Sequence, residues 1–299
     1  MMSAIKLAII QARMSSSRLP GKVLIDIAGK PLLQHMIERV QKAEYLNGVV
    51  IATTTDPSDD ILEQFCQDQD LPCFRGSLTD VLDRYYHAAS QFHAEVIVRL
   101  TADCPLIDPG LIDLTMDVFL GNSLPQNPPA YSKLTDRYPP GAYPFDFAAN
   151  RLPPPWKRTL PIGLDVEVCS FESLQRALKE ADQPYQREHV LPYLYEGVSF
   201  QESNLSPGQE WYIESGNTPR GFRVSLLNHF PDYGSLRWTV DTPADLKFIR
   251  EIFTHFEGQP DFSWRDILAL LEKEPDLATI NADVKHKSAF DVDNRSLGK

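Results

Sequence analysis

The chain has 299 residues, enough to bury a full α/β core in one large domain or in a domain with a smaller module. Its 42% hydrophobic and 23% charged residues, with a mean hydropathy of −0.28, are typical of a globular protein. The formal net charge of −12 argues against a nucleic-acid-binding protein, which normally carries a basic surface. A local basic cluster in such an acidic chain would therefore be informative.

The sequence offers no membrane or secretion signal. The apolar run at residues 7–10 is short and passes directly into Gln11 and Arg13, unlike a signal peptide. No apolar stretch approaches the length of a membrane span. The four cysteines at positions 66, 73, 104 and 169 form neither a CxxC pair nor metal-site spacing with histidine. We therefore expect reduced thiols, a cytoplasmic location and no membrane partner.

Strand and helix patterns alternate through the first 120 residues. Apolar runs predict strands at residues 4–11, 48–53, 73–75 and 95–100. Helical spacing of apolar residues predicts helices at 31–43 and from 78, and Asp-Pro pairs at 56–57 and 108–109 begin two more. Repeated βα units predict an α/β fold with a mostly parallel sheet and helices on both faces.

The pattern changes from residue 121. Residues 121–161 hold 10 of the 24 prolines, and the six aromatic residues between 131 and 156 favour an elaborated loop or lid over a disordered linker. Beyond it we predict a strand at 164–169, helices at 171–181 and 186–196, a strand pair at 222–227 and 236–240, and helices at 243–256 and 264–271.

These patterns divide the chain into four segments. Residues 1–120 form an α/β half, and residues 121–235 begin with a Pro-rich insertion in the same domain. Residues 236–275 supply the last strand and the C-terminal helices, and 276–299 a polar tail.

Polar segments follow the predicted strands. They are QARMSSSRLPGK, TTTD, RGS, TADCP and, after the last strand, DTP. Ligands of open parallel sheets bind beyond the carboxyl ends of the strands. We therefore expect all five segments to converge on one edge.

The first of these segments is basic. Arg13, Arg18 and Lys22 lie in one loop, with three serines between the arginines. Three cations beside backbone amides suit a triphosphate. The alternative is a surface loop with scattered basic residues. The segment is not a Walker A sequence, and no GxGxxG follows a strand.

Asp103 and Asp241 are not needed to begin helices. Asp108 caps the helix after Asp103, and Thr242 with Asp245 forms a capping box after Asp241. Two spare carboxylates near a phosphate-binding loop suit Mg²⁺. Solvated or turn-forming aspartates are the alternative.

Three further clusters stay ambiguous. Arg75 lies just after a strand and is a candidate for contact with a base or phosphate, whereas Asp83 and Arg84 suit a surface pair equally well. The segment QREHV, with Arg187, Glu188 and His189, suits a helix start or substrate contact. Asp165 and Glu167 alternate in a strand and share one face, which lies toward solvent or an acceptor pocket.

Long motifs of the chain resemble a known family. QARMSSSRLPGKVLIDIAGKPLLQHMIERV resembles the N-terminal signature of sugar-acid cytidylyltransferases, which activate 3-deoxy-manno-octulosonate and acylneuraminates. FRGSLTDVLDRYY, VRLTADCPLIDP, PIGLDVEV, REHV and RWTVDTPADL are similar to its spore-coat polysaccharide biosynthesis branch. The resemblance covers about residues 5–256 and implies a GT-A-like nucleotide-diphospho-sugar transferase fold, CTP, Mg²⁺ and a homodimer. It also implies that residues 1–120 are the nucleotide-binding half and that residues 121–235 carry an acceptor and dimerisation segment.

The resemblance also implies roles for single residues. Nucleotide binding falls on Ala12, Arg13, Ser16, Arg18, Lys22, Arg75 and Arg84. Arg13, Lys22 and Asp103 are the catalytic candidates, and Asp103 and Asp241 the metal ligands. The residues themselves, rather than the resemblance, make candidate acceptor contacts of Asp165, Glu167, Arg187, Glu188 and His189.

The resulting hypothesis is a Mg²⁺-dependent transfer of CMP from CTP to a sugar acid or related sugar for surface polysaccharide or glycan synthesis, with release of pyrophosphate. The first alternative is a GT-A glycosyltransferase that uses a nucleotide sugar. Its typical DxD motif occurs only at 68–70 and 291–293, away from strand ends. The second is a non-catalytic nucleotide-binding protein on the same fold.

Overall fold

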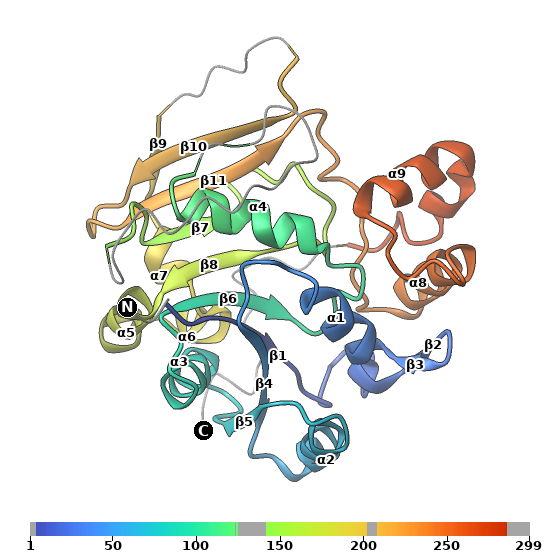
Figure 1. Ribbon diagram of the computed structural model, residues 1–299, viewed down its shortest axis with the longest axis horizontal. Helices are drawn as coiled ribbons and strands as arrows, with labels where there is room; N and C mark the ends of the chain where they lie inside the picture. Colours follow the sequence, from blue (N-terminus) through green and yellow to red (C-terminus); the bar gives the residue numbers. More distant parts are fainter. Residues whose placement is uncertain (1–3, 123, 125–141, 202–207, 286–299) are drawn as a thin grey trace.

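The computed structural model describes residues 4–122, 124, 142–201 and 208–285. Across these residues one nine-stranded sheet has the order β5-β4-β1-β6-β8-β7-β11-β10-β9, with helices on both faces (Figure 1). The strands of this sheet are β1 (Lys6–Gln11), β4 (Gly48–Thr54), β5 (Cys73–Gly76), β6 (Val96–Thr101), β7 (Phe147–Ala149), β8 (Glu167–Ser170), β9 (Ser199–Phe200), β10 (Trp211–Asn217) and β11 (Arg223–His229). A two-stranded sheet pairs β2 (Asp26–Ile27) with β3 (Lys30–Pro31).

The first half of the sheet confirms the predicted βα units. Strands β5, β4, β1 and β6 are all parallel, and the predicted strands lie within a residue or two of the observed ones. The connecting elements are the 3-10 helices η1 (Lys22–Leu24) and η2 (Pro57–Asp59) and the α-helices α1 (Leu32–Val40), α2 (Asp60–Asp68), α3 (Val81–Gln91) and α4 (Pro109–Phe119). Parallel strands need such crossover connections. Apolar runs typical of strands and apolar spacing typical of helices therefore alternate along this part of the sequence.

The predicted helix caps are present. Asp56 accepts a hydrogen bond from Ser58 N at the start of η2, and Asp108 accepts from the first turn of α4. Thr242 and Asp245 form the expected capping box. Asp103 and Asp241 cap no helix, so their carboxylates are left for other partners, as the sequence indicated.

The second half of the sheet differs from the prediction. Strand β8 lies antiparallel between β6 and β7, and β11 pairs with β7 and with β10. The predicted pairing of 222–227 with 236–240 is therefore wrong. The second of these segments makes only a single bridge, between Arg237 and Ile162. Apolar residues alternate with polar ones in 236–240 because Trp238 and Val240 are buried in the core, although the segment does not pair as a strand.

The predicted helix at 186–196 is two short helices, α6 (Pro184–His189) and α7 (Pro192–Tyr195). Val190 has a φ of 73° and Pro192 has no N–H to continue the helix, so the chain breaks between them. The helices α5 (Phe171–Glu180), α8 (Pro243–His255) and α9 (Trp264–Lys273) match the prediction, and η3 (Pro275–Thr279) follows. The predicted loop or lid at 121–161 contains β7, and its residues 123 and 125–141 lie outside the described part.

Two hydrophobic cores cover the two faces of the sheet. Residues of α1, α4, α8 and α9 pack on one face, and residues of α3, α5 and α7 on the other. This arrangement confirms the predicted fold class, an α/β sheet with helices on both faces. The four cysteines are free thiols. Among the described residues, we find no helix with the length and apolar character needed to cross a membrane.

Candidate active site

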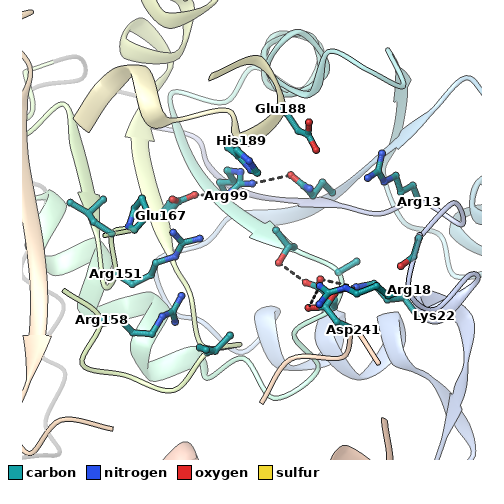
Figure 2. A pocket seen from close by; sticks show the side chains of 18 of the residues that line it. Arg13, Arg18, Lys22, Arg99, Arg151, Arg158, Glu167, Glu188, His189 and Asp241 are labelled. Atoms are coloured by element: carbon teal, nitrogen blue, oxygen red, sulfur yellow. Dashed lines mark hydrogen bonds and ion pairs between the residues drawn. The ribbon is translucent and has the colours of Figure 1, made fainter. Parts of the chain in front are cut away.

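A cavity of about 830 Å³ opens at the carboxyl ends of β1 and β6 (Figure 2). Its main lining segments are the loop after β1, the end of β6, the segment 151–158 and helix α6. The polar side chains in its wall are Gln11, Arg13, Ser16, Ser17, Arg18, Lys22, Arg99, Thr101, Asp103, Arg151, Arg158, Glu167, Glu188, His189, Tyr195 and Asp241. Three of the five predicted segments therefore converge. Those after β4 and β5 do not line the cavity.

One end of the cavity, which we call the aspartate end, comprises Arg18, Lys22, Asp103 and Asp241. The Nζ of Lys22 donates hydrogen bonds of 2.8 Å to Oδ2 of Asp103, to Oδ1 of Asp241 and to the carbonyl oxygen of Val240. All three ammonium hydrogens thus have an acceptor. Although 136 residues separate Thr239 from Asp103, the Thr239 hydroxyl and the Val240 N–H both donate to the Asp103 carbonyl, which brings the two aspartates together.

This network sets the charge of the aspartate end. Burial alone would raise the pKa of Asp103, but the adjacent Lys22 ammonium and a hydrogen bond from Thr101 hold that pKa well below its ordinary value. Burial alone would lower the pKa of Lys22, and the two aspartates raise it instead. The Asp103 carboxylate and the Lys22 ammonium are therefore charged near neutral pH.

Asp241 has two further cationic partners. The guanidinium groups of Arg18 and Arg237 each lie 2.7 Å from its Oδ2. Arg237 also donates from Nε to the buried Asp245 at 2.9 Å, so the acidic residue of the α8 capping box anchors this arginine. Three cations and three carboxylates thus form one connected network at this end.

The loop after β1 is held by a buried carboxylate that the sequence analysis overlooked. Asp59 is fully buried, and its Oδ1 accepts a hydrogen bond of 2.7 Å from the Met14 N–H. Its Oδ2 accepts from the hydroxyl of Thr54 at the end of β4. The N–H groups of Ser16 and Gly21 both donate to the Met14 carbonyl, so this residue organises the loop that carries Arg18 and Lys22.

The opposite end, which we call the arginine end, comprises Arg99, Arg151 and Arg158 (Figure 2). Arg99 is paired with Glu167 and donates to the side-chain oxygen of Gln11 at 3.2 Å. Arg151 and Arg158 both contact Asp165. No strand-end pattern marks Arg151 or Arg158. The arginine inside the apolar run VIVRL was the one signal that could have identified Arg99.

Most predicted site residues line the cavity, and five do not, Asp165 and the four described next. Arg75 donates hydrogen bonds to the Thr54 carbonyl, to Asp60 and to Glu63. Arg187 donates hydrogen bonds to Asp80. Arg84 is buried and donates to the Ser77 carbonyl, so it is not the surface pair with Asp83 considered above. Ala12 is buried and donates its N–H to the Ala52 carbonyl. Their predicted roles in nucleotide or acceptor binding stay predictions.

Two predicted acceptor residues lie differently from one another. Glu167 faces the cavity, whereas Asp165 lies behind Arg151 and Arg158 and is absent from the lining. Glu188 and His189 of α6 line the same space (Figure 2). Burial and the nearby Arg99 lower the pKa of His189, so its imidazole is neutral near neutral pH.

Asp103 and Asp241 fit a divalent cation. One oxygen of each reaches the same ammonium nitrogen at 2.8 Å, so the two carboxylates already converge on one positive charge. Mg²⁺ is usually held by one or two carboxylates together with phosphate oxygens and water. Within the described ranges no three His, Cys, Asp or Glu side chains group to hold a metal, so substrate oxygens would have to complete the shell.

Known proteins share this fold and sequence. The family described as cytidylyltransferase matches residues 7–251. An uncharacterized protein of Methanocaldococcus jannaschii is 32% identical over 290 residues, which cover 96% of this chain and 98% of that protein. The spore coat polysaccharide biosynthesis protein SpsF of Bacillus subtilis is 31% identical over 277 residues, covering 91% and 96% of the two chains.

A solved structure agrees with these sequence matches. The cytidylyltransferase from Leptospira borgpetersenii has a TM-score of 0.74 and 28% identity, and the match covers 95% of this chain and 100% of that one. The fold and the matched sequence are those of a nucleotidyltransferase. More particularly, the chain belongs to the cytidylyltransferase family. The predicted resemblance, the fold and the enzyme class are confirmed.

Proposed function

We propose that the enzyme transfers CMP from CTP to a sugar acid for surface polysaccharide or glycan synthesis and that it depends on Mg²⁺. The observation that carries this proposal is the aspartate end of the cavity. There the basic loop after β1 meets two carboxylates that no helix uses, within one connected network. Triphosphate binding and charge stabilisation at the α-phosphate need both kinds of group in one place.

The cationic loop would bind the triphosphate. Arg13, Arg18 and Lys22 come from this loop, and the Ser16 and Ser17 side chains line the same wall. Arg18 and Lys22 are paired with aspartates. When CTP binds, phosphate oxygens compete with those carboxylates for the same donors, because both are anionic acceptors.

Asp103 and Asp241 would hold Mg²⁺. The ion, when bound, stabilises negative charge on the phosphate oxygens of the substrate. Release of the two carboxylates from Lys22 would leave them as ligands, while Arg237 stays on Asp241 and fixes its orientation.

The acceptor would enter from the arginine end, where Glu167, Glu188 and His189 line the wall. Its anomeric hydroxyl oxygen forms the new bond to the α-phosphorus, and the bond from that phosphorus to the bridging oxygen of pyrophosphate breaks. A CMP-sugar, pyrophosphate and the hydroxyl proton are the products. The enzyme accelerates this step chiefly by positioning the two reactants.

A GT-A glycosyltransferase is not favoured. The DxD sequence at 68–70 lies at the end of α2, away from the cavity, and the one at 291–293 lies outside the described residues. The homodimer and the cytoplasmic location expected from the sequence stay predictions. Light scattering after size-exclusion chromatography would test the first.

Pyrophosphate release tests the proposal directly. The enzyme is incubated with Mg²⁺, each of the four NTPs, and a panel of sugar acids, sugar phosphates and neutral sugars. We expect release only from CTP with a sugar acid, and mass spectrometry should identify the CMP-sugar. Release from another NTP, release only with a sugar phosphate, or no release at all would contradict the proposal.

A further inference from the structure

The arginine end of the cavity contains a guanidinium, that of Arg151, whose bonded carboxylate is shared with a second arginine. Arg158 makes a two-point contact with Asp165, from Nη1 to Oδ1 and from Nη2 to Oδ2, the second at 2.8 Å. Such a fork-to-fork pair uses both carboxylate oxygens and neutralises one positive charge. Arg151 contacts the same aspartate, so two cations share one anion.

Arg151 is held by one atom only. Its Nε donates to Oδ2 of Asp165 at 3.0 Å, and its Nη1 and Nη2 donate no hydrogen bond to any other residue that the structure describes. Arg151 lines the cavity, whereas Asp165 lies behind it. The side chain is about one-fifth exposed, so its terminal nitrogens remain accessible from the cavity.

The backbone keeps this arrangement in place. Arg151 and Arg158 face each other across an antiparallel β-bridge, with the proline run 153–155 between them. Asn150, next to Arg151, donates to the Leu164 carbonyl at 2.7 Å and accepts from the Val166 N–H at 2.8 Å, on either side of Asp165. The aspartate and the arginine it holds are therefore fixed by two buried hydrogen bonds between their neighbours.

Other cations of the cavity are already bonded to polar or anionic partners. Arg99 is paired with Glu167, and its Nη2 is directed to Gln11. Arg18 and Lys22 are bound to aspartates. Burial alone would lower the pKa of Arg151, but Asp165 and Glu167 raise it, so the guanidinium stays charged.

We propose that Arg151 binds the carboxylate of the sugar-acid acceptor through its terminal nitrogens and that Asp165 positions Arg151 for this contact. This inference rests on the function proposed above and adds to it the residue that recognises the acid. A planar guanidinium with free donors matches a planar carboxylate, and it rejects neutral sugars because they leave its charge unsatisfied. Arg158 does not bind the acceptor. It cancels the charge of Asp165.

The main experiment compares an acid with its neutral counterpart. The sugar acid that gives the fastest pyrophosphate release is assayed beside its C1 carboxamide, with wild type, Arg151→Met and Arg151→Lys. We expect the KM for the acid to rise roughly 10- to 100-fold in Arg151→Met, because a charge-assisted contact is lost, while the KM for CTP stays unchanged. Arg151→Lys should fall between the two, because it keeps the charge and loses the two-point geometry.

The carboxamide and a distant arginine serve as controls. The activity of wild type on the carboxamide should already be low, and Arg151→Met should not lower it further. Arg223 also makes a two-point contact with an aspartate, Asp146, but lies outside the cavity, so Arg223→Met should leave both KM values unchanged. A rise in the KM for CTP in Arg151→Met, or equal losses for acid and carboxamide, would overturn the assignment.

Asp165→Asn separates positioning from charge. Removal of this negative charge makes the arginine end more positive, so a purely electrostatic role predicts tighter binding of the acid. Positioning predicts the opposite, a several-fold rise in the KM for the acid, because the Nε of Arg151 loses its charged partner. Melting temperatures measured in parallel check that each variant is folded at the assay temperature.

Binding without turnover distinguishes this inference from the proposed function. Each acid of the panel is titrated calorimetrically into the enzyme with a CTP analogue that carries a methylene group between its α and β phosphorus atoms. An acid that binds wild type and not Arg151→Met supports the inference even if no acceptor is turned over. An acid that binds both equally, or a panel from which no acid binds, would refute it.

Discussion

At the aspartate end of the cavity every cation lies against a carboxylate, whereas at the arginine end one guanidinium is left without its own. Lys22, Arg18 and Arg237 are bonded to Asp103, Asp241 and Asp245. Arg151 and Arg158 share Asp165 alone. Both ends are rich in charge, yet at the arginine end the guanidinium of Arg151 shares its bonded carboxylate with a second arginine.

The difference predicts two modes of binding. A ligand at the arginine end adds to the existing contacts, because the terminal nitrogens of Arg151 are accessible. A ligand at the aspartate end has to exchange partners, because a phosphate can take Lys22 or Arg18 only by releasing a carboxylate. A released, partly buried carboxylate needs a new cation. We therefore expect nucleotide and metal binding to be coupled, and acceptor binding to be independent of the metal.

The largest expected effect is at Asp103. Asp103→Asn removes one of the two carboxylates that meet at Lys22, and kcat for pyrophosphate release should fall about 100-fold or more, because charge stabilisation at the reacting phosphate is lost. Asp261→Asn is the matched control, since Asp261 is also paired with a lysine but is exposed. Turnover of Asp103→Asn near that of Asp261→Asn would remove Asp103 from the mechanism.

Lys22→Met tests whether the ammonium and the metal compete for the same place. Without nucleotide, the two aspartates lose the cation that bridges them, so the affinity for Mn²⁺, measured by electron paramagnetic resonance, should rise roughly tenfold. Lys30→Met, which removes an exposed lysine paired with Glu38, should change nothing. Unchanged Mn²⁺ affinity in Lys22→Met would show that the two cations do not share a site.

A smaller effect is expected at Asp59, which holds the loop of the aspartate end. Asp59→Asn replaces a charged acceptor of the Met14 N–H by a neutral one, and we expect the KM for CTP to rise about 3- to 10-fold with kcat less affected. Asp60→Asn changes the next residue, whose side chain is largely exposed and contacts Arg75. Equal KM values for these two variants would refute the positioning role of Asp59.

The smallest effect concerns acid sensitivity of the arginine end. Burial and Arg99 lower the pKa of His189 below its ordinary value of 6.5. As the pH falls, this imidazole is therefore protonated at a higher pH in the unfolded chain than in the folded chain. The corresponding stability is present above about pH 6.5 and is lost as pH falls through the folded pKa. His189→Gln should therefore reduce the drop in urea midpoint between pH 7.5 and 5.5. An unchanged drop would refute this.

The aspartate end could be predicted from sequence because local rules isolated its residues. Asp103 and Asp241 follow apolar runs and precede helices that already have caps, so elimination left them for other roles. This reasoning succeeded for Asp241 although the strand predicted before it is not paired as a strand. The residue is brought to Asp103 by hydrogen bonds from Thr239 and Val240 rather than by a sheet.

The arginine end could not be predicted from such local rules, because its contacts join residues that lie apart in the sequence and Arg151 and Arg158 belong to no recognisable motif. Arg151 and Arg158 lie in a proline-rich segment whose short strand, β7, gives little periodic signal. Asp165 was selected for facing an acceptor, and only the tertiary structure shows that it lies behind the arginines. The sequence analysis overlooked Asp59 for a different reason. It lies in a helix start, where an aspartate needs no further explanation.

The single bridge between Ile162 and Arg237 joins the two ends of the cavity. The Ile162 N–H donates to the Leu236 carbonyl at 2.8 Å, and the Trp238 N–H donates to the Ile162 carbonyl. A side chain at Gly163, whose φ is 106°, would collide with the Trp238 backbone 2.6 Å away. Asp165 and Asp241 lie a few residues beyond this junction, so the backbone sets their separation. If the proposed function is right, we expect this fixed separation to select acceptors by length, according to how many bonds separate the acid group from the attacking hydroxyl.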